Sequence, residues 1–534
     1  MALATSHAVG PTEPAVREVT LGSLLAEAAA AAPDRPGIIE GVADESARRQ
    51  WTYAEFLDDA RRVARALLAR HEPGDRVAIW AHNIPEWLLV EFGCSLAGIV
   101  LVTINPAYRA NELQYVLQQS RAQTLFVVND FRGNPMRATA DSVQAECPEL
   151  ADIICFDDWD DFVASGDPDR ALPDVQPDDP IMIQYTSGTT GFPKGAYLKN
   201  VGLANNGHHT GLRMGVREGG VFVVPMPLFH TGGSVCCTVG AVGTASTIVL
   251  VEAFEPGLVL ELMETYGGTA MLGVPTMLVA MIEHPDFGSR DLSSLEAICS
   301  GGSLVPAPLV TRFEEELGAP FTIVFGQTEC SPVASMTRPD DSVSDKAGTI
   351  GPPMPGVEVK IVSPETGETL PIGEVGEYCT RGYHVMTGYF EMPERTAEAI
   401  DDDGWLHTGD LCAMDDRGYC TVEGRLKDMI IRGGENIYPR ELEDLLFSHD
   451  AVGEVAVVGL PDEKWGETVA AFVRPAPGAA VDRNELFHYV REHLAPHKTP
   501  KHWFAVEEFP LTGSGKIQKY KLREQWQAGD WSEL

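Results

Sequence analysis

The chain of 534 residues is 44% apolar and 22% charged, a composition that provides for several hydrophobic cores and excludes a disordered or fibrous protein. Its 78 acidic and 40 basic residues give a formal net charge of -38, which would repel a nucleic-acid backbone or an anionic membrane surface. Any anionic ligand must therefore be held by a few locally placed cations and backbone N–H groups.

Ten cysteines are scattered along the chain without a C-x-x-C pair, so neither a disulfide framework nor a zinc site is indicated. A cytoplasmic setting fits this use of cysteine best. Residues 1–16 contain no Lys or Arg and no apolar block, so they differ from a secretory signal, and we expect a flexible leader. The longest weakly polar run, 232–251, is rich in Gly, Ser and Thr; we interpret it as buried core and expect no integral membrane segment.

The first half of the chain alternates helical and β-rich segments. Apolar residues recur at helical spacing over 17–31 and again over 51–70, where Thr52 is a plausible N-cap with Glu55 three residues later. Short β-rich runs lie between such helices, at 76–80, 99–103, 124–128, 221–224, 247–251, 270–272 and 297–299. This alternation predicts parallel sheets covered by helices.

The pattern changes twice in the last third of the chain. From Val357 short strands and turn signals predict an antiparallel β subdomain at about 357–425. Beyond it we expect a small α+β domain with strands at 429–432 and 455–458, a helix after Pro439 and a helix opening at Asp482 with Glu485 three residues on. In that last helix one buried face is expected to contain residues spaced by four, Leu486, Val490 and Leu494.

Lysine is scarce, and its positions are informative. The chain has eleven lysines, and the first of them, Lys194, closes the Gly- and Thr-rich loop 185–195 after an apolar run. Glycines let N–H groups turn toward a phosphate, hydroxyls add donors or a magnesium ligand, and the lysine adds charge. Gly191 and Lys194 are three residues apart, which excludes the G-x-x-x-x-G-K-[ST] pattern. A phosphate-binding loop is indicated, with a Thr- and Gly-rich surface hairpin as the alternative.

Other candidate ligand-binding segments follow in order. Lys516 ends a Gly/Ser-rich approach near the C-terminus, and Lys427 stands at the second change of pattern, ahead of the glycine pair 433–434. Taken singly, these would be a solvated tail and a linker ion pair. The segments 325–329 and 405–410 each place a carboxylate at a strand-to-loop junction, where open α/β sheets bind ligands.

This ordered set resembles the adenylate-forming superfamily of acyl- and aryl-CoA synthetases, luciferases and nonribosomal-peptide adenylation domains. The resemblance spans roughly 20–525, and the segments 326–332 and 432–437 are most similar to fatty-acyl-CoA synthetases. It implies an α/β fold: a large N-terminal domain, 1–426, of two parallel-rich sheets plus the β subdomain. It also implies a small, mobile α+β lid, 427–534, that pivots at Lys427.

The resemblance implies an AMP-forming acid–thiol ligase that works in two half-reactions. A carboxylate attacks the α-phosphorus of Mg-ATP to give acyl-AMP and pyrophosphate, and a thiol then displaces AMP after the lid rotates. A carboxylate is already an ionised nucleophile, so the first step needs in-line positioning and neutralisation of phosphate charge but no general base. The implied cofactors are ATP, Mg²⁺ and CoA or a carrier-protein phosphopantetheine.

Carried over position by position, the resemblance assigns the site residues. The ATP phosphates are expected to contact Thr186, Ser187, Gly188, Thr189, Thr190 and Lys194. The adenine and the acyl carbonyl are expected to be bordered by Gly301, Gly302, Ser303, Phe325, Gly326, Gln327 and Thr328. The family commonly has Tyr where this chain has Phe325, so a hydroxyl contact is lost while the stacking face remains. The ribose is expected to contact Asp410 and Arg425, with Mg²⁺ held by Thr186 and Glu329.

The same resemblance assigns further positions outside the nucleotide site. Lys516 would bridge the substrate carboxylate and the α-phosphate only during adenylation. Gly433 and Gly434 would line the pantetheine tunnel after rotation about Lys427. His230 would lie near the substrate carboxylate, although a core histidine bonded to backbone is the alternative. The acyl pocket is expected to draw on His230, Gly232, Cys236, Val274 and Met277, whose sizes suit an alkyl chain.

Several functions remain open at this stage. We expect a fatty-acyl-CoA ligase of medium chain-length range, acting on a carboxylic acid, ATP and CoA. An acyl-AMP ligase that loads an acyl carrier protein is an alternative, because both acceptors end in the same thiol; the candidate cations at the tunnel mouth are Arg432, Lys464 and Arg474. An aryl-acid ligase is the alternative for the substrate. A nucleotide-binding regulatory protein without catalysis is opposed by the presence of Lys516, Glu329 and Asp410.

Overall fold

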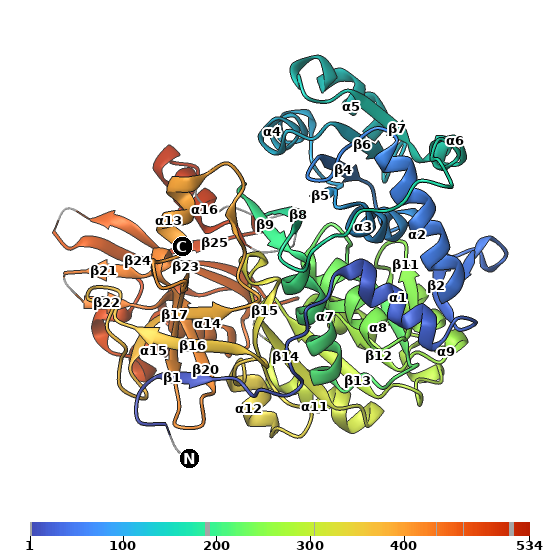
Figure 1. Cartoon of the computed structure of the whole chain (residues 1–534). Helices are drawn as coiled ribbons and strands as arrows, with labels where there is room; N and C mark the ends of the chain where they lie inside the picture. Colours follow the sequence, from blue (N-terminus) through green and yellow to red (C-terminus); the bar gives the residue numbers. More distant parts are fainter. Residues whose placement is uncertain (1–2, 187–192, 304, 434, 463, 512–516) are drawn as a thin grey trace.

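A computed structural model describes residues 3–186, 193–303, 305–433, 435–462, 464–511 and 517–534. Over these residues the strands form four sheets, of seven, eight, five and five strands. Figure 1 shows two α/β layers built from the first two-thirds of the chain, and beside them the antiparallel sheet and the C-terminal α+β unit. The predicted α/β fold with a large N-terminal and a small C-terminal part is therefore confirmed.

The seven-stranded sheet has the order β18-β9-β8-β5-β4-β6-β7, and its five strands from β8 to β7 are parallel. Its strands are β4 (Arg76–Trp80), β5 (Val100–Ile104), β6 (Thr124–Val127), β7 (Asp152–Cys155), β8 (Pro180–Tyr185), β9 (Gly195–Lys199) and β18 (Gly388–Tyr389). The helices between β4 and β8 in the chain are α3 (Pro85–Ala97), α4 (Ala110–Ser120), α5 (Met136–Val143) and α6 (Trp159–Ala164). The antiparallel β8–β9 hairpin carries the predicted phosphate loop at its turn.

The eight-stranded sheet, in the order β15-β14-β13-β12-β10-β11-β2-β3, joins strands from both ends of the large domain. Its strands are β2 (Pro36–Gly41), β3 (Gln50–Thr52), β10 (Val221–Val224), β11 (Thr247–Val251), β12 (Ala270–Leu272), β13 (Ala297–Gly301), β14 (Phe321–Gly326) and β15 (Val333–Met336). The helices around it are α1 (Leu21–Ala31), α2 (Tyr53–Leu68), α7 (Asn200–Met214), a π-helix (Gly232–Val239), α8 (Gly240–Gly243), α9 (Pro256–Tyr266), α10 (Pro275–Ile282), α11 (Ala307–Leu317) and α12 (Val343–Gly348). Six consecutive strands of this sheet, from β14 to β2, are parallel, as the alternating pattern predicts.

The third sheet is antiparallel throughout and has the order β1-β16-β17-β19-β20. It consists of β1 (His7–Val9), β16 (Val357–Val362), β17 (Val375–Gly382), β19 (Leu406–Met414) and β20 (Cys420–Arg425), with α13 (Pro393–Ala399) between strands. The expectation of a flexible leader was wrong for residues 7–9. They form an edge strand because their backbone hydrogen-bonds to β16, a pairing about 350 residues away that local sequence does not reveal.

The fourth sheet contains only residues after 429. It consists of β21 (Ile430–Arg432), β22 (Glu435–Ile437), β23 (Val452–Asp462), β24 (Gly466–Pro475) and β25 (His502–Ala505), accompanied by α14 (Pro439–Phe447), α15 (Arg483–His493) and α16 (Lys519–Ala528). The predicted strands and helices of this part are present. The prediction was wrong for Leu494, because α15 ends at His493 and Leu494 has extended backbone. The buried face of this helix therefore consists of Leu486 and Val490.

One of the first two helix starts was predicted from its capping pattern, and the other was not. Thr52 caps α2, and Glu55 returns the hydrogen bond to the Thr52 backbone, as the capping box requires. The first helix was predicted to begin near residue 17, yet it begins at Leu21 because Thr20 caps it together with Ser23. Arg17 instead donates its backbone N–H to the side chain of Asn205.

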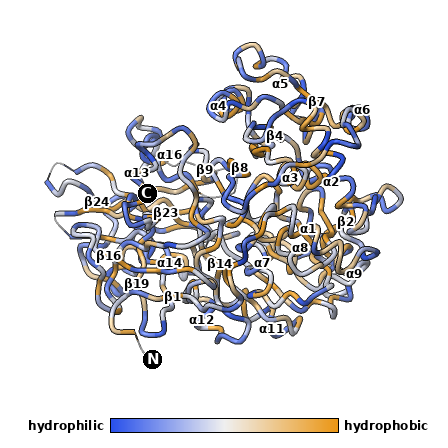
Figure 2. The backbone as a smooth tube through the Cα atoms, in the orientation of Figure 1, coloured by the Kyte–Doolittle hydropathy of each residue, from blue (hydrophilic) through white to orange (hydrophobic). Residues whose placement is uncertain are grey.

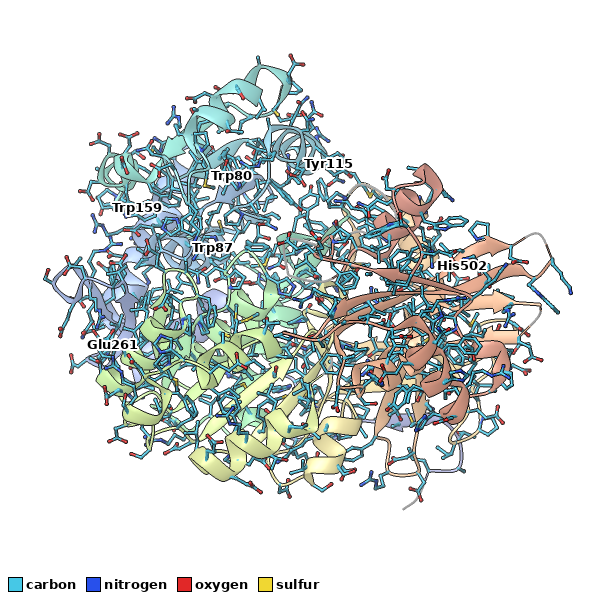
Figure 3. All side chains as sticks on the ribbon, turned by 180° about the vertical axis from the view of Figure 1, so that it is seen from behind. Trp80, Trp87, Tyr115, Trp159, Glu261 and His502 are labelled. Carbon is cyan, nitrogen blue, oxygen red and sulfur yellow. The ribbon has the colours of Figure 1, made fainter. Side chains whose placement is uncertain are left out.

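The apolar segments follow the strands and the inner helices, whereas the peripheral loops are hydrophilic (Figure 2). In the lobe around β4, Trp80 and Trp87 are fully buried, and Figure 3 shows Trp159 nearer its rim. The run 232–251 is buried core, as predicted, but it begins as a π-helix, a conformation that the sequence did not indicate. Among the helices of the described residues, not one combines the length and the apolar character needed to cross a bilayer.

One acidic residue lies inside this core. Glu91 on α3 is 1% exposed, and within the described part of the chain neither of its carboxyl oxygens has a hydrogen-bond partner. Burial therefore raises the pKa of Glu91 well above its ordinary value. The folded chain favours the neutral carboxyl of Glu91, whereas in the unfolded chain a glutamate has its ordinary pKa of about 4.3.

We predict that Glu91→Gln removes a pH-dependent loss of stability. Above the unfolded pKa the unfolded chain binds fewer protons than the folded chain, so wild-type stability falls as pH rises until the folded pKa is reached. The variant should gain up to ~1.4 kcal/mol per pH unit relative to wild type, measured by urea unfolding from pH 6 to 8. Glu146→Gln, at an exposed glutamate, is the control. A stability difference that stays constant over this range would contradict the assignment.

Candidate active site

The predicted phosphate loop begins and ends at the β8–β9 hairpin. Thr186 donates its backbone N–H to the carbonyl of Lys194 at 2.9 Å, which closes the base of the loop. Tyr115 on α4 donates its hydroxyl to the carbonyl of Pro193 at 2.9 Å, and Figure 3 shows Tyr115 on the side of its lobe that faces the C-terminal part. Four predicted phosphate ligands lie outside the described residues: Ser187, Gly188, Thr189 and Thr190. The flanking strands β8 and β9 pair as an antiparallel hairpin, which is compatible with both interpretations of the loop.

A lysine, a tyrosine and a glutamate meet beside this hairpin. The Nζ atom of Lys194 lies 4.0 Å from the ring centroid of Tyr389 on β18, within the range of a cation–π contact. The Tyr389 hydroxyl donates to Glu329 Oε1 at 2.7 Å, and Glu329 is 9% exposed. Burial lowers the pKa of Lys194, an effect that the charge of Glu329 partly offsets. Tyr389 thus joins a cation and an anion that sequence analysis had predicted separately.

A second acidic group is held on β19. Asp410 is 4% exposed; its Oδ1 accepts from Arg425 Nε at 2.8 Å and its Oδ2 accepts from Gln327 Nε2 at 2.9 Å. Gln327 also donates to the carbonyl of Thr408 at 2.8 Å, which links the end of β14 to β19. The structure therefore brings together three residues that were predicted from three separate motifs. The carboxylate retains acceptor capacity, because each oxygen can accept a further hydrogen bond.

The aromatic and glycine positions border this acidic group. Phe325 at the end of β14 packs edge-on against Tyr378, with ring centroids 5.1 Å apart. A Cβ atom on Gly326 would lie 1.9 Å from the Pro332 carbonyl oxygen, so only glycine fits there. Gly302, at φ +77°, and Ser303 are exposed, whereas the preceding Ser300 is fully buried. Thr328 opens the short 3₁₀ turn Thr328–Cys330 that presents Glu329.

His230 precedes the π-helix and caps its first turn. Its Nδ1 accepts the backbone N–H of Gly232 at 3.0 Å, which fixes the ring orientation. Gln184 on β8 accepts from the N–H of Thr231 at 3.0 Å and donates to Ser234 Oγ at 3.1 Å. The strand that leads into the phosphate hairpin therefore also holds the start of the π-helix. π-helical turns occur frequently at functional sites.

The C-terminal part approaches the site through residues 425–433. Burial lowers the pKa of Lys427, and the nearby charges of Arg425 and Lys194 act in the same direction, whereas Asp410 opposes them. Gly433 has φ +62°, and a Cβ there would lie 2.7 Å from the Trp465 ring. Gly434 and Lys516 lie outside the described residues.

Neither Tyr389, which belongs to this cluster, nor Trp465, whose ring adjoins Gly433, was predicted from the sequence. Tyr389 lies in the segment Thr387-Gly388-Tyr389, which carries no charge or loop signature, and it joins the site only because β18 pairs with β9. Trp465 is 42% exposed and has Arg432 and Lys464 against its ring, at 5.7 Å and 4.7 Å from the centroid. The signal available in the sequence was a tryptophan directly after Lys464, one of the eleven lysines.

Comparisons with known proteins identify the family of this chain. The profile of the AMP-binding enzyme family matches residues 25–390, and that of the AMP-binding enzyme C-terminal domain matches residues 441–516. YngI of Bacillus subtilis (strain 168), whose name describes an acyl-CoA synthetase, is 41% identical over 95% of this chain and 96% of its own length. The mitochondrial medium-chain acyl-CoA ligase ACSF2 of Rattus norvegicus is 36% identical over 97% of this chain and 89% of its own.

A solved structure, ATP-bound MatB from Rhodopseudomonas palustris, is also similar. It has a TM-score of 0.86 and 29% identity, and the match covers 95% of this chain and 99% of that chain. Fold and site define an adenylate-forming enzyme. The chain belongs to the AMP-binding enzyme family and is an AMP-forming acid–CoA ligase.

We predict that Tyr389→Phe weakens ATP use while leaving the fold intact. The variant keeps the ring against Lys194 but removes the hydrogen bond to the buried Glu329, a loss of about 1.5–3 kcal/mol for a charged acceptor. We expect kcat/KM for ATP in pyrophosphate exchange to fall by roughly 10-fold or more. Tyr419→Phe, which removes a 2.7 Å hydrogen bond to Asp341 away from these motifs, is the matched control. Equal effects of the two substitutions would refute a specific role for Tyr389.

Proposed function

We propose that this enzyme converts a medium-chain fatty acid, ATP and CoA to an acyl-CoA thioester, AMP and pyrophosphate, by way of bound acyl-AMP. The observation that carries the proposal is a continuous set of contacts. Lys194 contacts Tyr389, Tyr389 contacts Glu329, and two residues earlier Gln327 contacts Asp410, which pairs with Arg425. Cations and acceptors for a triphosphate, a metal ion and a ribose thus adjoin one another.

In the first half-reaction the acid oxygen attacks the α-phosphorus and pyrophosphate leaves. Lys194 and the loop N–H and hydroxyl groups would hold the phosphates, with Ser187, Gly188, Thr189 and Thr190 supplying the loop. Lys516 would bridge the acid and the α-phosphate, and His230 would lie beside the acid. The lowered pKa of Lys194 has burial as its cause, and an incoming phosphate would favour the charged form again.

The nucleoside would be held by the second group. Phe325 would stack on adenine beside the backbone of Gly301, Gly302, Ser303, Gly326 and Thr328. Asp410, kept in place by Arg425 and Gln327, would accept the ribose hydroxyls. Oxygen donors from Thr186 and the buried Glu329 suit Mg²⁺, which prefers hard oxygen ligands, and the ion would neutralise phosphate charge.

In the second half-reaction a thiol attacks the acyl carbonyl and AMP leaves. Lys516 and the thiol would approach the same carbonyl, so one static arrangement does not serve both steps. We infer that residues 427–534 rotate as a lid against residues 1–426, with Lys427 as the pivot. Gly433 and Gly434 would then line the pantetheine path.

CoA is favoured over a carrier protein by the surroundings of Trp465. The exposed indole offers a stacking face for adenine, and Arg432 and Lys464 place two positive charges beside it for phosphates. A carrier protein would present phosphopantetheine without that nucleotide. The third candidate cation, Arg474, pairs instead with Glu454 at 3.0 Å.

A medium-chain acid is favoured by the packing behind the expected pocket. The π-helix that carries Cys236 touches α7 so closely that a Cβ on Gly207 would lie 2.7 Å from Val239 Cβ. Close packing at this point would oppose extension of an alkyl chain between these two helices. Val274 and Met277 are partly buried apolar residues on the opposite segment, and medium-chain ligases are among the relatives. An aryl acid is the alternative substrate.

The test of the function is a panel of straight-chain acids from two to eighteen carbons together with aromatic acids. We expect acid-dependent pyrophosphate release to peak with medium-chain acids, and thioester to form with CoA in preference to an acyl carrier protein. Lys516→Ala is the control and should abolish pyrophosphate release while thioester formation from supplied acyl-AMP persists. Maximal turnover of aromatic acids, or preference for the carrier protein, would overturn the corresponding part of the proposal.

We predict that Trp465→Ala weakens the use of CoA but not the use of pantetheine, which has the thiol end of CoA without its nucleotide. Loss of a stacking platform costs ~1–3 kcal/mol by analogy with base stacking, so KM for CoA should rise roughly 10-fold. KM for pantetheine, which lacks the nucleotide, should stay unchanged. Phe447→Ala, at an aromatic side chain on α14 that is 51% exposed, is the control. Equal changes for CoA and pantetheine would contradict the assignment.

A further inference from the structure

The strand that carries Asp410 is distorted next to it. Cys379 of β17 pairs with His407 of β19, and Glu377 pairs with Leu411. One residue of β17, Tyr378, therefore faces three residues of β19, which are Thr408, Gly409 and Asp410. Such bulges redirect a side chain out of the regular ladder and are over-represented next to active sites. This bulge sets where the Asp410 carboxylate points.

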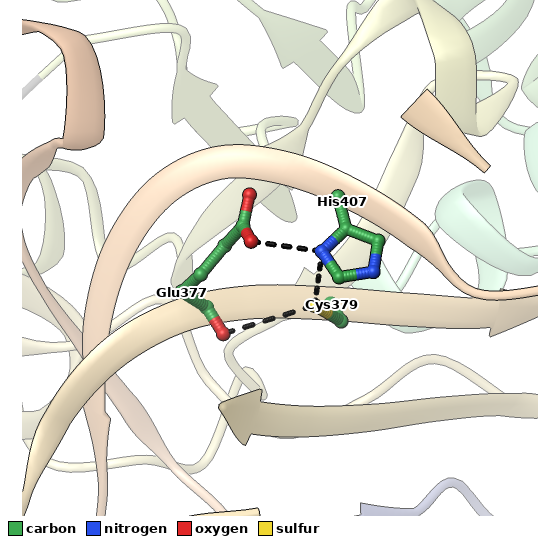
Figure 4. A group of neighbouring side chains, drawn as sticks. All are labelled: Glu377, Cys379 and His407. Carbon is green, nitrogen blue, oxygen red and sulfur yellow. Dashed lines mark hydrogen bonds and ion pairs between the residues drawn. The ribbon is translucent and has the colours of Figure 1, made fainter. Parts of the chain in front are cut away.

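Glu377 holds the bulge with both of its oxygens. Its Oε1 accepts the backbone N–H of Gly409 at 3.0 Å, and its Oε2 accepts from His407 Nδ1 at 2.8 Å (Figure 4). Thr408 donates its hydroxyl to the Tyr378 carbonyl at 2.6 Å, which closes the same loop. The Glu377 side chain is about nine-tenths buried, so these contacts are shielded from water.

His407 lies between two carboxylates. Its Nε2 is 3.5 Å from Asp401 Oδ2, while Asp401 Oδ1 accepts the N–H groups of Asp403 and Trp405. Hydrogen bonds to Cys379 and then to Glu377 raise the pKa of His407 to about 10. Burial raises the pKa of the Cys379 thiol, and Glu377 Oε2 lies 2.8 Å from the ring nitrogen Nδ1.

These groups also have the composition of a metal site, because ligand atoms of Glu377, Cys379 and His407 lie within 4.8 Å of one another. The distances favour a shared proton. Nδ1 and Oε2 are 2.8 Å apart, a charge-assisted hydrogen bond, whereas two ligands ~2.1 Å from one tetrahedral ion would be about 3.4 Å apart. The cluster is therefore better explained as an ion pair that supports the bulge.

We propose that Glu377 is a positioning residue for nucleotide binding: it fixes the Gly409 amide and His407, and thereby the orientation of Asp410 toward the ribose. This inference rests on the proposed ribose contact of Asp410. The side chain of Asp410 is held by Arg425 and Gln327, and its backbone pairs with Arg425 of β20 on one side of the strand. On the other side, toward β17, the Asp410 N–H lies in the bulge and donates to Thr408 Oγ1 at 3.1 Å. Glu377 is the charged group that reaches this backbone from the neighbouring strand.

The test measures binding of AMP and of 2′,3′-dideoxy-AMP by calorimetry, which needs no acid substrate and no catalysis. Wild type should bind AMP at least ~10-fold more tightly than the dideoxy analogue, because Asp410 bonds the hydroxyls. Glu377→Gln should bring this ratio toward one while affinity for the dideoxy analogue stays unchanged. Glu377→Asp, which keeps the charge, should restore part of the ratio.

Controls separate the possible outcomes. Glu358→Gln, at a partly exposed glutamate paired with Arg381 on the adjacent strand, should keep the wild-type ratio. In an Asp410→Asn background Glu377→Gln should add no further loss of discrimination. If Glu377→Gln weakens both ligands equally, its role is structural and the inference fails. If purified wild type holds one zinc ion per chain that Glu377→Gln loses, the metal explanation replaces it. If wild type itself binds both ligands alike, the proposed ribose contact fails instead.

Discussion

A protein with a net charge of -38 that binds a triphosphate must concentrate positive charge in one small region and keep its own carboxylates from cancelling it. Here Tyr389 satisfies that constraint, because Lys194 lies against its ring while Glu329 accepts its hydroxyl. Arg425 and Gln327 likewise each bond one oxygen of Asp410, and both oxygens retain acceptor capacity. In the proposed function these acidic groups would serve a metal ion and a ribose.

The scaffold explains why these groups can meet. Carboxyl ends of parallel strands lie at one edge of a sheet, and the segments after β8 and β14 start from such edges of two different sheets. The antiparallel sheet supplies β19 with its bulge, and β18, whose segment lies between β17 and β19 in the chain, pairs with β9. Each of these three sheets therefore contributes residues to the proposed nucleotide site, and the fourth sheet carries Trp465 and its neighbouring cations.

Local signals in the sequence were sufficient to predict several strands and one helix start. The strands at 76–80, 221–224, 247–251 and 270–272 were predicted with their observed bounds, because buried parallel strands are continuous apolar runs. Thr52 with Glu55 predicted a helix start, since a capping box is contained within four residues. Prediction failed in the N-terminal strand because its partner β16 is distant in the sequence. At Arg17 and Leu494 it failed because the local cap at Thr20 and the local end of α15 at His493 were not recognised.

The sequence by itself determined the chemistry of this protein: which residues carry charge, which loops suit a phosphate, and in what order the motifs occur. Only the tertiary structure decided that β2 and β3 complete the sheet of β10 to β15, that Tyr389 joins Lys194 to Glu329, and that Glu377 supports the bulge before Asp410. The physical reason is that residue type fixes what a side chain can bind, whereas pairing between distant strands fixes which side chains share a site, and strand pairing leaves little trace in any short segment.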